Sequence, residues 1–445
     1  MEKGISPAVA IAIVTVIIAA SLGSYIAFFT GEESIADSGP RTSNVFVEPS
    51  VSSLDTSGAT PSSVSELVRG ANKFAFDIYS KLAEEENNVF FSPYSIHTCL
   101  SMVYEGARGE TEEEMRKALN LPEESDIRRP AFAKLQRELN ENRVVKLKTA
   151  NALWPQENYP FFEEYLETVR KYYLARIEAL DYVHDASGAV ERINAWAAEH
   201  TENKIKKVLN YLSPLTRLVL TNAIYFKGDW LMPFDEFRTE NESFHLPSGS
   251  SIDTPMMQFH ENRLIENMFY YAETDNIQAL KLPYSGENMS MIFLLPKEES
   301  GGIGWLQNNI TYSKFENIQE KFEKREMREI KIPKFEFKTE YKKEFVKALQ
   351  DLGINAAFIP EEANFSGMDG TRDLFIYEAV HKAYIKVDEV GTEAAAVTAV
   401  VMAGTAVPPP RPSFVADHPF MFIIEDEKTG AILFIGSVSN PQSSQ

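Results

Sequence analysis

The sequence predicts an α+β protein with large β-sheets, preceded by an apolar segment and a polar linker. From Val64 onward, short apolar runs with the length of strands interleave with segments of helical periodicity, without the regular strand–helix–strand order of a Rossmann domain or a barrel. No internal repeat and no second linker interrupts residues 66–440. We therefore expect one large domain over residues 66–445, although 445 residues at roughly 150 per domain would allow about three.

The first element is an uncharged apolar run over residues 5–29. Because a helix of about 20 apolar residues spans the hydrocarbon core of a bilayer, this run predicts a membrane anchor within residues 1–29. A cleaved secretory signal is the main alternative, although its apolar region is usually only ~7–15 residues long, and a buried core helix is another. Lys3 precedes the run and Glu32–Glu33 follow it, which favours a domain outside the cytoplasm, either anchored or secreted.

The next segment, residues 30–65, is rich in Ser, Thr, Pro and Gly and contains few large apolar residues. Such a composition cannot offset the entropy of ordering, so the segment is expected to be a stalk. Residues 66–85 then show the period of an amphipathic helix, with Leu67, Phe74, Ile78 and Leu82 on one face. Runs typical of buried strands follow at 218–220, 289–295 and 431–438.

Composition excludes several classes of protein. The chain has 44 Lys and Arg residues against 65 Asp and Glu residues, a net charge of −21, which argues against nucleic-acid binding because that function needs basic surface. Hydrophobic residues make up 44% of the chain, which is ordinary for a globular protein and excludes wholesale disorder. The one cysteine, Cys99, excludes an intramolecular disulfide framework and a cysteine-rich zinc site.

Signals for catalysis are poor. The chain has no G-x-S-x-G, P-loop or H-E-x-x-H motif, and His260–Glu261 lacks the second histidine that a zinc protease helix needs. Asp181, His184 and Asp185 are close in sequence, but we expect them to be solvated on a surface loop. A basic stretch over residues 128–148 is expected to be a solvated helix face, so a polyanion cofactor is not expected. We therefore expect no enzyme, no metal site and no cofactor.

One segment near the C-terminus permits two interpretations. Residues 387–407 are almost entirely small or β-branched, contain no proline, and are followed by Pro408–Pro410. Slim alternating side chains are suited to a central strand, from which proline is barred. Gly391 and the three prolines, in contrast, are typical of a loop. The local sequence leaves both a permanent core strand and a loop open.

Several long motifs resemble the serpin family over essentially all of residues 66–442. They are NVFFSPYSIHTCLSMVYEGARGETEEEM (88–115), INAWAAEHTENKIKKVL (193–209), LVLTNAIYFKGDWLMPFD (218–235), PMM (255–257), IKIPKFEF (330–337), AVHKAYIKVDEVGTEAAA (379–396) and FVADHPFMFII (414–424). The resemblance implies three β-sheets, about nine helices and an exposed reactive-centre loop. It also implies inhibition of serine-type endopeptidases by a suicide-substrate mechanism. The loop is bait in the native state and an inserted central strand after acylation, so both interpretations of 387–407 hold in turn.

The resemblance also implies roles for individual residues. The loop hinge, where insertion begins, matches Glu389, Gly391, Thr392, Glu393, Ala394, Ala395 and Ala396. The shutter, a polar cluster beneath the centre of the sheet, matches Ser92, Ser95, Asn222 and His381. The breach, at the top of the sheet, matches Trp230. A charged residue or proline at Thr392 would stall insertion.

The reactive-site bond is expected at Thr405 or Ala406, within the range 404–407. These side chains are small and neutral, so a trypsin-like protease would gain no ion pair from them. The expected partners are serine proteases with small or permissive pockets, of the elastase or subtilisin type. A non-inhibitory serpin that acts as a carrier or interaction protein remains the alternative function, but no proline occurs between 391 and 407, and Thr392, where insertion begins, is neither charged nor bulky.

Overall fold

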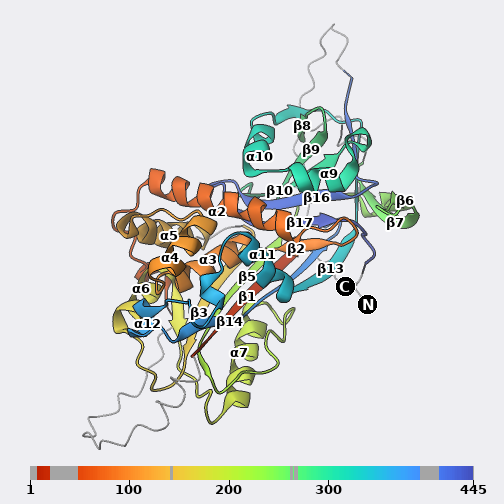
Figure 1. Cartoon of the computed structure of the whole chain (residues 1–445). Coiled ribbons are helices and arrows are strands. Elements are labelled where there is room, and N and C mark those ends of the chain that lie inside the picture. The colour runs from red at the N-terminus through yellow and green to blue at the C-terminus, as the bar shows by residue number, and fades with distance from the viewer. Residues whose placement is uncertain are drawn as a thin grey trace, which may run out of the picture.

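The structure is a computed structural model that describes residues 8–20, 49–140, 144–260, 264, 269–390 and 410–443. It contains three β-sheets, of six, seven and four strands, with helices packed around them (Figure 1). The predicted α+β class with three sheets is confirmed. Residues 391–409, which hold most of the expected reactive-centre loop, lie outside the described residues.

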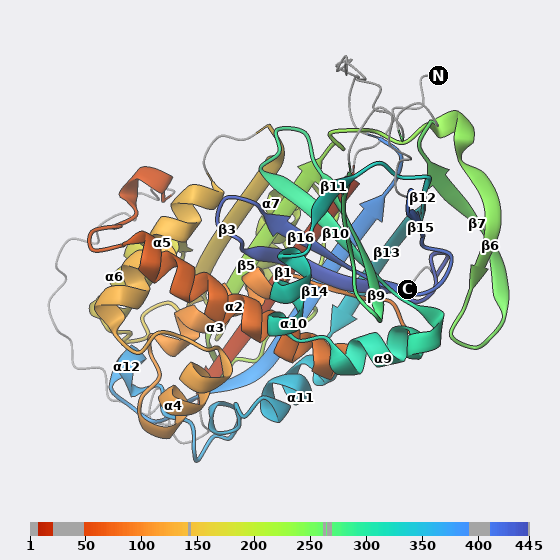
Figure 2. The same ribbon diagram turned by 90° about the horizontal axis from the view of Figure 1, so that it is seen from above.

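The six-stranded sheet, called the central sheet below, has the strand order β13-β14-β1-β5-β3-β4. Its strands are β1 (Ala8–Ala20), β3 (Lys146–Pro155), β4 (Ala175–Ile177), β5 (Thr216–Gly228), β13 (Phe335–Tyr341) and β14 (Leu374–Val387). All neighbours are antiparallel except β3 and β4. Seen from above, β3, β5, β1, β14 and β13 lie side by side beneath the helices (Figure 2).

Strand β1 corrects the expectation of a transmembrane helix at residues 5–29. Ala8–Ala20 is a β-strand that pairs with β14 on one side and with β5 on the other. Among the residues that the structure describes, no helix is long and apolar enough to cross a bilayer. The physical reason is that a strand buried on both faces is as continuously apolar as a membrane helix. The abundant Val and Ile residues have side-chain rotamers that suit a strand.

The other two sheets pack at one end of the molecule. The seven-stranded sheet contains β2 (Val89–Phe91), β8 (Phe269–Glu273), β9 (Ile277–Pro283), β10 (Met289–Pro296), β11 (Glu323–Arg325), β16 (Phe420–Asp426) and β17 (Ile432–Val438). The four-stranded sheet contains β6 (Glu240–His245), β7 (Ser251–Gln258), β12 (Glu329–Pro333) and β15 (Ser413–Val415). The runs predicted as buried strands at 218–220, 289–295 and 431–438 fall in β5, β10 and β17, which are almost completely buried.

The described residues contain ten α-helices, of which the last is a single turn. They are α2 (Pro61–Leu82), α3 (Pro93–Tyr104), α4 (Gly109–Ala118), α5 (Ser125–Leu139), α6 (Glu163–Tyr173), α7 (Ala186–His200), α9 (Gly302–Asn309), α10 (Tyr312–Gln319), α11 (Lys343–Asp351) and α12 (Ser366–Asp369). Four 3-10 turns accompany them: η1 (Val51–Ser53), η2 (Glu236–Arg238), η3 (Glu298–Ser300) and η4 (Ala356–Phe358).

Helix α2 shows how local sequence sets an element. Thr60 and Ser63 form a reciprocal capping box, and Pro61 occupies the first turn, where its missing N–H is not needed. The predicted apolar face, Leu67, Phe74, Ile78 and Leu82, is buried. The helix begins inside the segment assigned to the stalk, and Leu54, further upstream, is 3% exposed against α5 and the end of α6.

The central sheet is covered on both faces. On one face α3 and the seven-stranded sheet form the main core, to which Val14, Val16 and Ile18 of β1 contribute. On the other face Ile17 joins a second apolar cluster that includes Trp196 of α7. The alternation of these side chains is that of an ordinary central strand.

Candidate functional site

The candidate site is the top of the central sheet, where β14 ends and the chain continues toward the expected loop. Val387 is the last residue of β14, and the chain is described again from residue 410, before β15. Of the expected hinge residues, Glu389 is described. Gly391, Thr392, Glu393, Ala394, Ala395 and Ala396 lie outside the described residues, as do Thr405 and Ala406.

Glu389 is held at three points. Its carboxylate accepts a hydrogen bond from Thr239 Oγ1 at 2.6 Å and one from Lys334 Nζ at 2.6 Å. Its carbonyl oxygen accepts from the Phe234 backbone N–H at 3.1 Å. The Glu389 side chain is 6% exposed and the Lys334 side chain 38%. Burial by itself raises the pKa of Glu389, but the hydrogen bonds from Lys334 and Thr239 outweigh it and lower the pKa below its usual value.

Trp230 contacts the residue that precedes Glu389. Its indole Nε1 donates to the carbonyl oxygen of Asp388 at 2.9 Å, and its ring stacks on Tyr284 with the centroids 4.6 Å apart. Phe234 contacts the indole edge-on at 6.2 Å. Trp230 is 1% exposed. The structure thus places the expected breach residue in contact with Asp388, the first residue after β14.

Three of the four expected shutter residues lie together. The Ser92 backbone N–H donates to Nε2 of His381 at 3.1 Å, and its hydroxyl donates to the Leu433 carbonyl at 2.7 Å. The same hydroxyl accepts from the Ser95 N–H at 3.1 Å, which caps α3. Ser92, Ser95 and His381 have no exposed surface. Ser92 therefore links the central sheet, the seven-stranded sheet and α3.

Asn222, the fourth expected shutter residue, lies on the other side of β1. Val14 is the cross-strand partner of both His381 on β14 and Asn222 on β5. Two strand spacings, about 10 Å, therefore separate the two backbones. Asn222 Nδ2 instead donates to Asn151 Oδ1 at 2.6 Å, and Asn151 donates to Tyr173 O at 2.6 Å. The structure does not join Asn222 to His381 directly.

Other expected positions differ in outcome. His184 is exposed and its Nδ1 lies 3.0 Å from Asp181 Oδ2, as expected of a solvated loop. The expectation of a solvated basic helix face is wrong for Arg128, because its side chain is 4% exposed and lies 3.5 Å from buried Glu105. Arg129 also turns to Glu105, at 2.8 Å. The basic stretch is therefore not one continuous positive surface.

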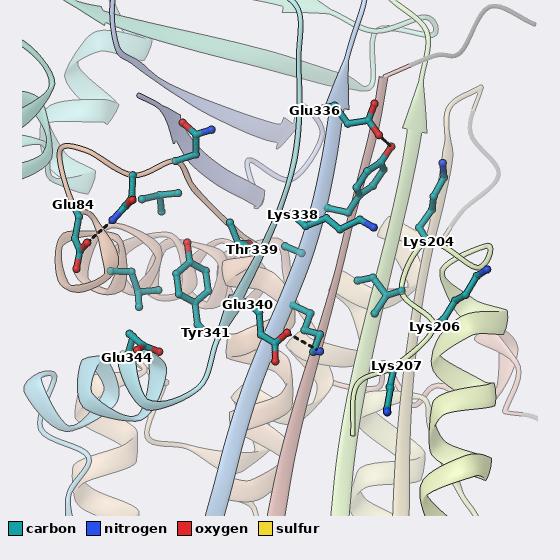
Figure 3. Close-up of a pocket in the computed structure, with 18 of the residues that line it drawn as sticks. Glu84, Lys204, Lys206, Lys207, Glu336, Lys338, Thr339, Glu340, Tyr341 and Glu344 are labelled. Atoms are coloured by element: carbon teal, nitrogen blue, oxygen red, sulfur yellow. Dashed lines mark hydrogen bonds and ion pairs between the residues drawn. The ribbon is translucent and has the colours of Figure 1, made fainter. Parts of the chain in front are cut away.

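A cavity of about 1010 Å³ opens on the same face of the central sheet as α7 (Figure 3). Tyr384 of β14 lines the cavity, and the Nζ atoms of Lys204 and Lys338 are 5.2 and 5.8 Å from its ring centroid. The Tyr384 hydroxyl donates to Glu336 at 2.9 Å. Lys204, Lys206 and Lys207 lie on one side of the cavity, and Glu84 and Glu344 lie on the other (Figure 3).

Sequence reasoning missed several residues of the site. Lys334 and Thr239 hold Glu389, and Asn151 holds Asn222. Lys334 falls in the IKIPKFEF motif, so its stretch was visible but its role was not. Asn151 could be found only from the pairing of β3 with β5, which places it directly opposite Asn222.

Comparisons with known proteins agree with this arrangement. The family model described as "Serpin (serine protease inhibitor)" matches residues 69–441. An uncharacterized serpin-like protein of Thermococcus kodakarensis is 43% identical over 380 residues, 84% of this chain and 86% of that protein. Intracellular coagulation inhibitor 2 of Tachypleus tridentatus is 36% identical, covering 84% of this chain and 90% of that protein.

Solved structures share the fold. The native stressed conformation of Arabidopsis AtSerpin1 superposes with a TM-score of 0.73 at 28% identity, covering 85% of this chain and 99% of that one. The class of protein is defined by the three sheets, the contacts that hold Glu389 after β14, and the family match over residues 69–441. The chain belongs to the serpin family, whose members are generally protease inhibitors rather than catalytic enzymes.

Proposed function

We propose that this chain inhibits serine-type endopeptidases as a suicide substrate. The protease serine hydroxyl attacks the carbonyl carbon at the reactive bond, an ester forms, and the broken peptide bond releases a new amino terminus. The loop then inserts as a strand of the central sheet and carries the esterified protease with it. About 15 residues at ~3.3 Å each span roughly 50 Å, enough to move the protease from one pole to the other.

The observation that carries this proposal is the strand position next to β14. β14 is the strand from which the expected loop departs, and the position between β14 and β5, held here by β1, pairs a strand with both along nearly its whole length. The family model, described as a serine protease inhibitor, supports the same function. So does the printed name of the Tachypleus relative, a coagulation inhibitor.

Specificity follows from the small side chains at the expected bond, Thr405 or Ala406. The proposed targets are serine proteases with small or permissive pockets, of the elastase or subtilisin type. No polyanion cofactor is part of the proposal, because Arg128 and Arg129 pair with Glu105 instead of facing solvent together. Membrane attachment is not part of it either, because Ala8–Ala20 lies in the sheet.

The test is incubation of the full chain with elastase and with subtilisin, followed by denaturing electrophoresis. We expect a complex that survives SDS, and mass spectrometry of the released peptide identifies the bond. The hinge variant Thr392→Arg should be cleaved at the same bond without forming the complex, because a charged residue cannot enter the sheet interior. Rapid cleavage of the unmodified chain without any complex would refute inhibition.

One observation favours the second candidate, a non-inhibitory serpin that acts as a carrier or interaction protein. The position that an inserting loop needs is already filled by β1. If β1 never leaves, a cleaved loop has no place to insert. The melting temperature before and after loop cleavage separates the two functions, since only an inserting loop should raise it.

A further inference from the structure

Residues 8–20 form a strand of the central sheet that comes from a distant part of the chain. β1 precedes the first helix by a long stretch of chain, yet it lies in the middle of a sheet whose other strands all come from residues 146–387. It pairs with β14 from Val9 opposite Lys386 to Ala20 opposite Leu374, and with β5 over the same length. Figure 1 shows β1 in red between β14 and β5.

The described side chains of β1 are fully integrated into the core. Val14, Val16 and Ile18 have no exposed surface, and Ile17 is 2% exposed. Thr15, the one polar residue of the strand, is 1% exposed and opposite Thr221 of β5. Because apolar surface and two backbone ladders are both satisfied, the position is a built site for an extended, apolar strand.

The direction of β1 is the direction that the loop would take. Any strand that follows β14 through a turn must run antiparallel to it, and β1 is antiparallel to both β14 and β5. β1 also starts at the end of β14 near Lys386, where the chain leaves toward Glu389 and the loop. A loop strand would therefore enter at the same end and run the same way.

The sequence of β1 resembles that of the loop. Aligned without gaps, residues 8–20 (AVAIAIVTVIIAA) lie over 391–403 (GTEAAAVTAVVMA). In this alignment four residues are identical: Ala12 with Ala395, Val14 with Val397, Thr15 with Thr398 and Ala20 with Ala403. Ile17 and Ile18 align with the similar residues Val400 and Val401. Both segments combine small and β-branched residues and have a Val-Thr pair at the same place. Both segments therefore have side chains of a kind that suits the same strand position, the one between β14 and β5.

We propose that residues 8–20 are an internal competitor of the reactive-centre loop. This inference rests on the proposed function. While β1 is in place, β14 and β5 both have their edges paired, and an inserting loop finds no strand edge to join. Loop insertion therefore requires β1 to leave, and the chain inhibits a protease only when the segment is free to be displaced.

The experiment staples β1 in place in the full chain. The variant Val16→Cys with Ala379→Cys puts cysteines at two cross-strand partners, whose Cα separation in an antiparallel pair is within disulfide range. The matched control, Ala150→Cys with Ala223→Cys, joins β3 to β5 in the same sheet and leaves β1 without a crosslink. The native Cys99, which is fully buried in the unmodified chain, is kept in both variants.

Each variant is oxidised or reduced, then mixed with elastase or subtilisin. We expect the oxidised β1 staple to be cleaved without trapping the protease, and complex formation to return on reduction. If about a tenth of the molecules escape oxidation, the yield of complex falls about tenfold. The control pair should form the same amount of complex in both states.

Two results would overturn the inference. One is an equal yield of complex from the stapled and the reduced protein. The other is failure of the β1 pair to crosslink under conditions that crosslink the control pair, since β1 would then not lie beside β14. If no form of the protein, the unmodified chain included, traps a protease, the proposed function fails instead. The inference is then judged by melting temperature: loop cleavage should raise it in the reduced variant and not in the oxidised one.

Discussion

Removing Lys334, the cation that binds the carboxylate of Glu389, should destabilise the domain to an extent that depends on pH. In Lys334→Met the Glu389 carboxylate, 6% exposed, keeps its bond from Thr239 and loses the one from Lys334. Breaking a fully buried pair costs ~3–5 kcal/mol, whereas an exposed pair contributes ~0–1. Because Lys334 is 38% exposed, solvent screens its end, and we expect a loss of roughly 1–2 kcal/mol at pH 7.

The sign of the pH dependence follows from the lowered pKa of Glu389. A carboxyl whose pKa is depressed on folding contributes stability above its unfolded pKa, about 4.3, and loses it as the pH falls through the folded value. The penalty of Lys334→Met should therefore shrink as the pH falls from about 4.3 toward 3. Urea titrations at pH 7 and pH 3, followed by tryptophan fluorescence, measure both free energies.

A double-mutant cycle isolates the pair. Lys334→Met, Glu389→Gln and the double variant should give a coupling energy of about 1 kcal/mol at pH 7. The control is Lys342→Met, which removes a surface lysine 2.9 Å from Glu340 with both side chains more than 40% exposed, and it should change stability by less than about 0.5 kcal/mol. A coupling energy of zero, or a penalty that is unchanged at pH 3, would refute the reasoning.

Three further predictions concern buried groups. Burial raises the pKa of Glu425 to about 7, so the neutral carboxyl is compatible with the folded domain below about pH 4.5 and the domain loses stability as the pH rises through 7. The free energy of unfolding should therefore fall by on the order of 2–3 kcal/mol between pH 5 and pH 8 in urea titrations, and Glu425→Gln should abolish this fall. Glu105→Gln should destabilise the domain by roughly 3–5 kcal/mol, because it leaves Arg128, 4% exposed, without its carboxylate; an unchanged urea midpoint would contradict this. Cys99 is fully buried and burial raises its pKa, so iodoacetamide should label it only after unfolding, and labelling of the native protein would contradict this.

The sequence predicted the fold well where patterns and family motifs coincide. The helical period at residues 66–85 and the apolar runs of β10 and β17 identified their elements directly, because burial on one or both faces leaves a periodic mark. The family resemblance grouped His381 with Ser92, and in the structure the two are joined by a direct hydrogen bond.

The sequence failed where a segment could satisfy two environments. Residues 5–29 have the length and hydrophobicity of a membrane helix, and those properties are shared by a strand buried on both faces. The decision depends on whether a strand position is available elsewhere in the chain, which no local pattern reveals. The separation of Asn222 from His381 was unpredictable for the same reason, since it is a consequence of β1.

Arg128 failed for a different reason. A cluster of basic residues in an acidic chain usually faces water, yet Arg128 is paired with Glu105, 23 residues earlier in the chain. Such pairings depend on the packing of α3 against α5, which becomes visible only in three dimensions. The residues that hold Glu389 were missed likewise, because Thr239 and Lys334 lie far from it in sequence.

The hydrogen bond between Ser92 and His381 determines which nitrogen of the neutral imidazole carries the proton. Because the Ser92 N–H donates to Nε2, that nitrogen carries no proton, and a neutral ring must hold its proton on Nδ1. Nε2 can carry a proton only after the hydrogen bond from the Ser92 N–H is broken. The tautomer of one ring is thus a spectroscopic record of whether β14 and α3 are still joined, which the ¹⁵N chemical shifts of His381 would report.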